Sequence, residues 1–132
     1  MEVYWQFLDY VSSTGRNQIV EWYERLSRQE QATFDQLIRN LARLKQWEGR
    51  EFKKLTGKTN RKHRGLSELR FKAGNKQHRV IGYHGPAAGQ YSLLIGCNHK
   101  GRIYDPPEAL DSAARRRNEI QRGEAKSVEH RL

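Results

Sequence analysis

The feature that most constrains the fold is a run of three short, largely apolar segments in the second half of the chain. Residues 66–73, 78–84 and 90–98 have strand length, and the spacers GNKQ and GPAAG between them carry the glycine and proline that turns use. We therefore predict three successive strands that pair antiparallel. In the last, the apolar residues of YSLLIGC do not alternate with polar ones, which predicts a central strand covered on both faces.

The N-terminal part predicts one more strand and two helices. Residues 3–11 are rich in aromatic and β-branched side chains, and the strand they predict ends at SSTG. After Gly15, apolar residues recur at spacings of three and four, which indicates an amphipathic helix that ends near Ser27. Ser27 and Glu30 form the S-x-x-E pattern of a capping box, so a second helix follows at once. Its apolar stripe consists of Phe34, Leu37, Ile38, Leu41 and Leu44.

The segment DPPEALDSAARRRNEIQRG predicts a third helix. Asp105 suits the N-cap, Pro106 the first turn and Glu108 the capping-box position, while Gly123 suits the end. Residues 124–132 contain little apolar material, and we expect them to form a flexible tail.

These elements predict a single α+β domain over residues 1–123. Its small, mainly antiparallel sheet carries the N-terminal helical hairpin on one side, and the chain ends with the C-terminal helix. Cys97 is the sole cysteine and lies in an apolar run, which excludes a disulfide framework and favours a reducing compartment. No apolar run approaches the roughly 20 residues of a membrane span, and no leader pattern is present, so we expect a cytoplasmic protein without a membrane partner.

Charge indicates a polyanionic partner. The chain has 25 lysines and arginines against 15 acidic residues, which gives a formal net charge of +10. Such a balance favours nucleic acid or an acidic protein as partner. Residues 50–64 concentrate it, with seven cations and one acid, Glu51. We expect a loop here, either a solvated linker or an arm that contacts nucleic-acid phosphates through Lys53, Lys54, Arg61 and Lys62.

A second group of cations falls on the predicted strands. If Leu69 and Phe71 face the core, alternation turns Glu68, Arg70 and Lys72 to the other face. In a hairpin register, Arg79 of the next strand shares that face. Such cations are either solvated or paired with carboxylates such as Glu68, or they stabilise negative charge on a phosphodiester attacked by its own 2′-hydroxyl.

The sequence contains no pattern for a metal or a cofactor. Its five histidines lack paired ligand spacing, Cys97 has no companion cysteine, and no P-loop, G-x-S-x-G or H-E-x-x-H pattern occurs. Any chemistry must therefore come from ordinary side chains. Further candidates follow the last strand, and they are Lys100, Arg102 and Tyr104, while His78 and His99 fall near the same edge of the sheet.

Three stretches together resemble a known family. RGLSELRFKAG, HRVIGY and YSLLIGCNHKGRIYDPPEALDSAARR, in this order, are similar to the RelE/HigB toxins of bacterial type II toxin–antitoxin systems, including phage-derived members of the RelE/ParE superfamily. The resemblance spans about residues 3–117. It implies a microbial RNase-like fold and a metal-independent endonuclease that cuts mRNA in the ribosomal A site and is neutralised by a cognate acidic antitoxin.

The resemblance also implies roles for individual residues. Arg79 would stabilise the scissile phosphate, and Arg70 and Lys72 would position phosphates or assist proton transfer. Glu68 would orient a neighbouring cation rather than act as a base. Lys100, Arg102 and Tyr104 stand where such toxins carry a further cation and a phenol. Where many relatives have paired lysines this chain has Asn98 and His99, which makes His99 a candidate general acid.

Two alternatives remain open at this point. One is an inhibitor of DNA gyrase of the related ParE kind, which needs no RNA-cleaving groups. The other is a binding module for RNA or protein on the same scaffold, without catalysis.

Overall fold

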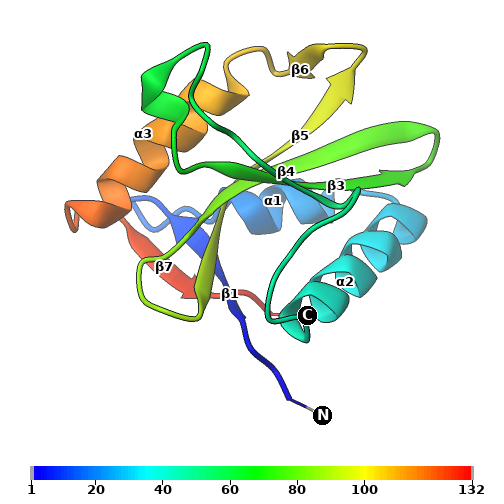
Figure 1. The fold of residues 1–132 in the computed structure, drawn as a ribbon, viewed down its shortest axis with the longest axis horizontal. Helices are drawn as coiled ribbons and strands as arrows, with labels where there is room; N and C mark the ends of the chain where they lie inside the picture. Colours follow the sequence, from blue (N-terminus) through cyan, green and yellow to red (C-terminus); the bar gives the residue numbers. More distant parts are fainter. Residues whose placement is uncertain (1, 132) are drawn as a thin grey trace.

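Seven strands form one mixed sheet in the computed structural model, which describes residues 2–131 (Figure 1). The strands are β1 Gln6–Val11, β2 Phe52–Lys54, β3 Ser67–Ala73, β4 Lys76–His84, β5 Gln90–Lys100, β6 Ile103–Asp105 and β7 Lys126–Glu129. Their order is β2-β3-β4-β5-β1-β7, and β6 pairs with the C-terminal end of β5. All neighbours are antiparallel except β1 and β5.

Three α-helices pack on this sheet, which makes the fold α+β as predicted. They are α1 Gln18–Glu24, α2 Arg28–Ala42 and α3 Ala109–Gln121. The helices α1 and α2 contribute to one core cluster on the sheet, and α3 contributes to a second cluster that includes Ile81 and Leu94. Within residues 2–131, no helix has both the length and the apolar character needed to cross a bilayer.

Local sequence chemistry accounts for the hairpins and the central strand. Gly74 and Asn75 join β3 to β4, and both have φ of 60°, the left-handed conformation that a two-residue hairpin turn requires. In β5, Leu93 belongs to the first core cluster and Leu94 to the second, and both are fully buried. The predicted central strand with two covered faces is confirmed.

The capping box of α2 is also confirmed. The Ser27 hydroxyl accepts from the Glu30 amide at 3.1 Å, and the Glu30 carboxylate accepts from the Ser27 amide at 2.8 Å. The apolar stripe of α2 is buried as far as Leu41. Leu44, predicted to extend that stripe, lies beyond the end of the helix and is half-exposed.

The start of the third helix differs from the prediction. Asp105 does not cap the helix, because it ends β6 and pairs with Asn98 of β5. The helix begins only at Ala109, and Glu108 in the N-cap position makes no side-chain hydrogen bond. Backbone pairing with β5 therefore keeps the chain extended through Asp105, although the local sequence favours a cap there.

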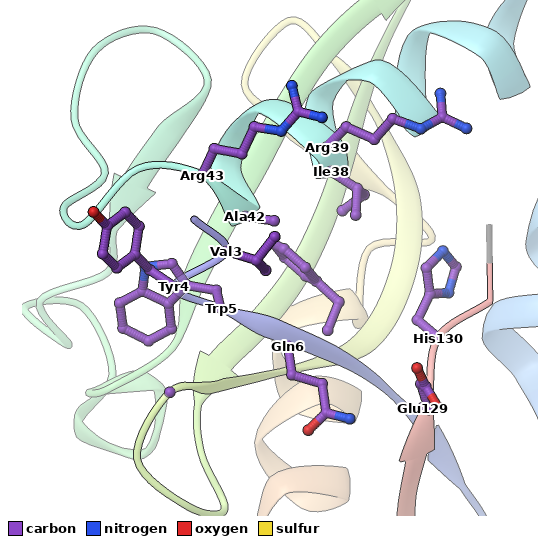
Figure 2. A pocket seen from close by; sticks show the side chains of 12 residues that line it. Val3, Tyr4, Trp5, Gln6, Ile38, Arg39, Ala42, Arg43, Glu129 and His130 are labelled. Carbon is purple, nitrogen blue, oxygen red and sulfur yellow. The ribbon is translucent and has the colours of Figure 1, made fainter. Parts of the chain in front are cut away.

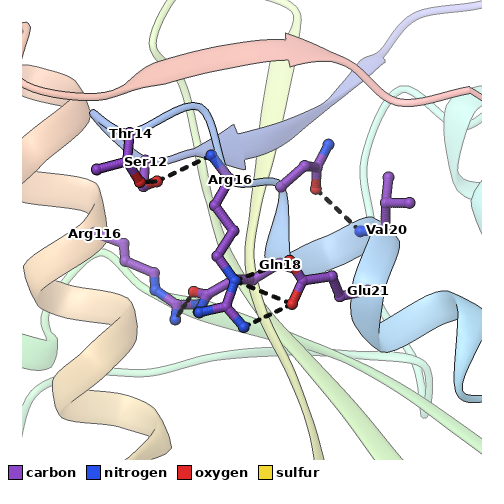
Figure 3. Close-up of polar contacts among 8 residues, drawn as sticks. Ser12, Thr14, Arg16, Gln18, Val20, Glu21 and Arg116 are labelled. Atoms are coloured by element: carbon purple, nitrogen blue, oxygen red, sulfur yellow. Dashed lines mark hydrogen bonds and ion pairs between the residues drawn. The ribbon is translucent and has the colours of Figure 1, made fainter.

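A buried arginine anchors α3 to the rest of the fold. Arg116 donates from Nη1 to the carbonyl oxygen of Leu94 at 2.7 Å and from Nη2 to Oε1 of Gln18, and its guanidinium lies 5.2 Å from the centre of the Tyr10 ring. Figure 3 shows this arginine beside the Arg16–Glu21 ion pair of the α1 region. The helix is thus tied to both β5 and α1.

The expectation of a flexible tail over residues 124–132 is corrected for the part that the structure describes. Residues 126–129 form β7, which pairs antiparallel with β1. Beyond it, the His130 amide donates to the Phe7 carbonyl at 2.9 Å, and His130 Nδ1 lies 2.8 Å from Oδ1 of the buried Asp9. Backbone pairing and one buried polar contact order this segment, so its low apolar content was misleading.

Candidate functional site

The register between β3 and β4 brings the predicted cations together. Arg70 is the Cα partner of Arg79, Lys72 of Gln77, and Glu68 of Ile81. Since alternate residues share a face, Glu68, Arg70, Lys72 and Arg79 lie on the side of the sheet that carries α3, as strand alternation predicted. The helix packs over the part of this face that includes Ile81 and Leu94.

One buried carboxylate organises the site. Oε1 of Glu68 accepts from Nε of Arg70 at 2.8 Å and lies 2.6 Å from Nη2 of the same side chain. Nε of Arg79 lies 3.8 Å from the same oxygen, and the Tyr104 hydroxyl donates to Oε2. We call these four residues, Glu68, Arg70, Arg79 and Tyr104, the Glu68 cluster. Two guanidinium groups and one carboxylate leave it with an excess of positive charge.

Arg79 is the most buried cation of the cluster, with 7% of its surface exposed. Nη1 donates to the His78 carbonyl and Nη2 to Oε1 of Gln77, both at 3.0 Å. Burial lowers the pKa of Arg79, and the charge of Glu68 opposes this shift. Arginine titrates so far above neutrality that the group stays charged. The protein therefore holds a fixed, partly desolvated positive charge at this point.

Tyr104 and His99 meet on the β5–β6 hairpin. They are Cα partners, and their ring centroids lie 4.8 Å apart. Burial, followed by the hydrogen bond to Glu68, raises the pKa of Tyr104 well above its ordinary value. The phenol is consequently a proton donor at neutral pH and not a base. His99 is partly exposed beside it, and histidine is the side chain most often used for proton transfer in enzymes.

Other predicted catalytic residues lie further out. The Lys100 side chain is 80% exposed and lies 3.9 Å from Asp105, and Arg102 occupies the exposed turn between β5 and β6. Among residues 2–131, no hydrogen bond or ion pair joins Lys100 or Arg102 to the Glu68 cluster. Lys72 is exposed on the cluster's face. The structure thus gathers Arg70, Arg79 and Tyr104 around Glu68, with Lys72 and His99 near them.

The basic segment 50–64 is not the plain loop that we predicted. Lys53 and Lys54 belong to β2, and Lys53 is the Cα partner of Glu68. Arg61 and Lys62 lie in a short 3₁₀ helix, Arg61–His63. Hydrogen bonds hold this part of the chain to α3, because Arg117 donates to the carbonyl oxygens of Arg64 at 2.7 Å and Lys62 at 2.8 Å.

A carboxylate neutralises part of the same segment. Asp111 of α3 lies 3.1 Å from Nζ of Lys62 and 2.7 Å from Nε2 of His63, and the hydrogen bond from His63, then that from Lys62, lowers the pKa of this carboxyl. The side chains of Lys53, Lys54 and Arg61 are exposed. The segment therefore presents an ordered cationic surface beside the sheet rather than a mobile arm.

A groove of about 920 Å³ adjoins the Glu68 cluster. Its lining comes from α2, from the residues before β2, and from β3 and β4, and includes Thr33, Gln36, Asn40, Arg50, Glu51, Phe71, Lys72 and Gln77 together with both arginines of the cluster. The α2 side of this groove was not predicted from the sequence. Thr33, Gln36 and Asn40 recur at helical spacing, which is a detectable polar stripe, but the stripe alone does not show which strand it faces.

A second cavity, of about 470 Å³, lies apart from these groups (Figure 2). Figure 2 shows it between the N-terminal residues Val3–Gln6 and the C-terminal half of α2, with Arg39 and Arg43 at its rim. None of the Glu68 cluster lines it. We therefore place the candidate site at the cluster and its groove.

Metal-binding and thiol chemistry find no support in the side chains present. Within residues 2–131, no group of three or more histidine, cysteine, aspartate and glutamate side chains is placed to hold a metal ion. Cys97 is buried, and burial raises the pKa of its thiol to about 12, which disfavours the reactive thiolate. The cluster and its groove present guanidinium, ammonium, phenol and carboxylate groups, with the imidazole of His99 beside Tyr104.

Comparison of the chain with known protein families, curated proteins and solved structures finds no match.

Proposed function

We propose that the protein is a metal-independent endoribonuclease, and that it acts on mRNA at the ribosome as the toxin of a toxin–antitoxin module of the RelE/HigB kind, with the microbial RNase-like fold of that family. The observation that carries the proposal is the Glu68 cluster: two arginines on adjacent strands, held by one buried carboxylate, with a protonated phenol on its other oxygen. This arrangement offers fixed positive charge and a proton donor at one point of the sheet.

The chemistry that fits these groups is attack by the 2′-hydroxyl of RNA. The 2′-oxygen forms a bond to phosphorus, the bond from phosphorus to the 5′-oxygen breaks, and one proton moves from the 2′-hydroxyl to a base while another reaches the leaving oxygen. The products carry a 2′,3′-cyclic phosphate and a 5′-hydroxyl. Negative charge grows on the phosphate oxygens during this step, and fixed guanidinium groups stabilise it.

Within this proposal each residue of the site has a separate role. Arg79 and Arg70 bind the phosphate oxygens, and Lys72 positions a neighbouring phosphate. The raised pKa keeps the Tyr104 phenol protonated, and in the reaction its hydroxyl exchanges the hydrogen bond to Glu68 for one to the leaving oxygen. His99, next to Tyr104, exchanges protons with the substrate or with the phenol. Glu68 orients the arginines, and no metal or cofactor takes part.

The partners follow from charge. We propose that Lys53, Lys54, Arg61, Lys62 and Arg102 contact ribosomal RNA or mRNA, because exposed cations gain affinity by releasing counterions from nucleic acid. We further propose an acidic antitoxin that covers the cations, and a cytoplasmic location beside the ribosome.

The test is primer-extension mapping of an mRNA on programmed bacterial ribosomes in EDTA. The parent protein should give discrete cuts in the A site. Arg79→Lys keeps the charge but loses the planar fork, and should cut at least about 100-fold more slowly. Arg122→Lys, an exposed arginine at the end of α3, is the matched control and should cut like the parent. Absence of cuts by the parent, or equal cutting by Arg79→Lys, would reject the proposal.

One observation favours a second candidate, an RNA-binding module without catalysis. Arg79 already donates hydrogen bonds to His78 and Gln77, and Arg70 already pairs with Glu68. Fewer N–H donors of the two guanidinium groups are therefore left to bind a phosphate. This candidate predicts RNA affinity with a steep salt dependence and no product in the ribosome assay. Detection of A-site cuts would exclude it.

A further inference from the structure

We propose that the groove between α2 and β3 binds one unpaired base of single-stranded RNA, and that Gln36 and Asn40 read it. This inference rests on the proposed function, because it takes the Glu68 cluster as the binding site of the adjacent phosphate. It assigns a role to α2, a helix that contributes no residue to the cluster.

The groove runs around the edge of β3, because α2 lines it from one face of the sheet while Arg70, Lys72 and Arg79 line it from the other, and it is therefore continuous with the Glu68 cluster. Arg70 and Arg79 belong to the Glu68 cluster and also line the groove, together with Lys72 and Gln77. Gln77 is the residue that holds Nη2 of Arg79. An RNA strand whose phosphate contacts Arg79 therefore has its next nucleotide at the mouth of the groove. The volume of about 920 Å³ lies at the upper end of the range of about 300–1,000 Å³ typical of ligand sites, so a nucleotide fits.

The charge of the groove suits a polyanion. Four cations, Arg50, Arg70, Lys72 and Arg79, line it against a single carboxylate, Glu51. Among the residues from 2 to 131, neither Arg50 nor Lys72 forms an ion pair with a carboxylate. Both side chains are exposed and available to a phosphate. Phe71 and Leu37 add apolar surface to the lining, which is what the face of a base contacts.

An amide pair on α2 supplies the means to read a base. Nε2 of Gln36 donates to Oδ1 of Asn40 at 2.9 Å, and the two residues are one helical turn apart on the exposed side of the helix. This bond leaves Oε1 of Gln36 as an acceptor beside Nδ2 of Asn40 as a donor. Reversing both amides leaves the same combination of one donor and one acceptor. Bases are recognised through such adjacent donors and acceptors on their edges.

A peptide is the competing occupant. The pairing of β2 with β3 reaches only to Phe52 and Leu69, so the outer edge of β3 beyond Arg70 has no strand partner among the described residues. An extended acidic segment can add to such an edge. The free amide donor and acceptor lie on α2, away from that edge, and a backbone strand makes no use of them, so the RNA base accounts for more of the groove.

The experiment measures binding without cleavage. Fluorescence anisotropy gives the dissociation constants of fully 2′-O-methylated oligonucleotides of adenosine, cytidine and uridine, and of an abasic oligomer of equal length. We expect the parent to bind at least one base-bearing oligomer about 5- to 100-fold more tightly than the abasic one, and to distinguish the three bases. Equal affinity for all four would overturn the inference.

Variants then assign the effect to residues. Gln36→Leu with Asn40→Leu should abolish the differences between bases while leaving the salt dependence of binding unchanged. Gln29→Leu with Gln121→Leu removes two exposed amides outside the groove and should behave like the parent. Arg50→Gln with Lys72→Gln should weaken all oligomers alike and reduce the salt slope by about 2. Thermal melting checks that each variant is folded.

The remaining outcomes separate the two proposals and the two occupants. If the parent discriminates bases through Gln36 and Asn40 but gives no cuts on ribosomes, the inference stands and the proposed nuclease function fails. If a poly-glutamate peptide binds in a manner that depends on Arg50 and Lys72, while base discrimination survives the loss of both amides, the groove is a peptide site and the inference fails.

Discussion

Glu68 is the residue on which the candidate site depends. Arg70 and Arg79 lie directly opposite each other on β3 and β4, and like charges in that position repel. The buried carboxylate supplies the compensating charge, and it accepts from Tyr104 as well. The same contacts that hold the cations for a phosphate therefore also stabilise the sheet.

Replacement of this carboxylate should be costly. Glu68→Gln keeps the shape but removes the charge, which leaves Arg79 buried without a counter-ion. We expect the free energy of unfolding in urea at pH 7 to fall by about 2–4 kcal/mol. Glu51→Gln, an exposed acid at the rim of the groove, should change it by no more than about 0.5 kcal/mol. A Glu68→Gln protein as stable as the parent would refute the role given to this residue.

Tyr23 provides a pH dependence of known sign. Burial, followed by its hydrogen bond to Asp35, raises the pKa of Tyr23 to about 12. Above about pH 10 the unfolded chain loses this proton and the folded protein keeps it, so stability falls as pH rises from about 10 towards 12. Below pH 10 the phenol is neutral in both states and adds no slope.

The Tyr23→Phe variant tests this linkage. The drop in the free energy of unfolding between pH 8.5 and pH 11 should be smaller in the variant than in the parent, because the variant lacks this phenol. Urea unfolding at the two pH values measures both drops. Equal drops in the two proteins would show that Tyr23 is not linked to folding.

Elements with a strong local sequence pattern were predictable. The short strands, which form only because they pair with a longer neighbouring strand, were not. The Gly74–Asn75 turn and the Ser27–Glu30 capping box have a direct physical cause in the residues themselves. The short strands β2, β6 and β7 have three or four residues each, and no apolar periodicity marks them. They exist because a longer strand lies next to them, which a single-sequence pattern does not reveal.

The packing of α1 on β5 depends on a missing side chain. A Cβ atom on Gly96 would overlap the ring of Trp22, which packs edge-on against Phe34 in the first core cluster. Gly96→Ala should lower the free energy of unfolding by about 2 kcal/mol or more. Gly101→Asn is the control, because nothing lies within 4 Å of that position and asparagine tolerates its φ of 60°. Urea unfolding of both variants makes the comparison, and equal stabilities would contradict this packing.

The C-terminal strand offers a further test. His130→Ala removes one of two side-chain partners that the buried Asp9 carboxylate has among residues 2–131, and the other is Asn17, which donates to it at 3.1 Å. We expect a loss of about 3 kcal/mol, because one partner of a buried pair is left alone. Glu129→Ala, its exposed neighbour, should lose no more than about 0.5 kcal/mol. No loss for His130→Ala would restore the prediction of a flexible tail.

In the whole molecule, the two faces of the sheet differ in what they carry. The helices α1 and α2 build the larger core on one face, and the opposite face carries both α3 and the predicted cations. Strand alternation predicted that Glu68, Arg70 and Lys72 share a face, and the assumption of a hairpin register added Arg79, as the structure has it. The groove was not predictable, because it depends on how α2 lies against β3. For the same reason, the sequence did not show that Gln36 and Asn40 line it.

The attack by the 2′-hydroxyl can be tested on the substrate itself. An mRNA on programmed ribosomes is prepared with a single 2′-deoxynucleotide on the 5′ side of the mapped scissile phosphate, where the attacking 2′-hydroxyl would lie. Its cleavage in EDTA is compared with that of the unmodified mRNA. The proposed mechanism predicts cleavage of the unmodified mRNA to a 2′,3′-cyclic phosphate and a 5′-hydroxyl, and no cleavage at the deoxy position. Equal cleavage of both messages, or cleavage of neither, would contradict it.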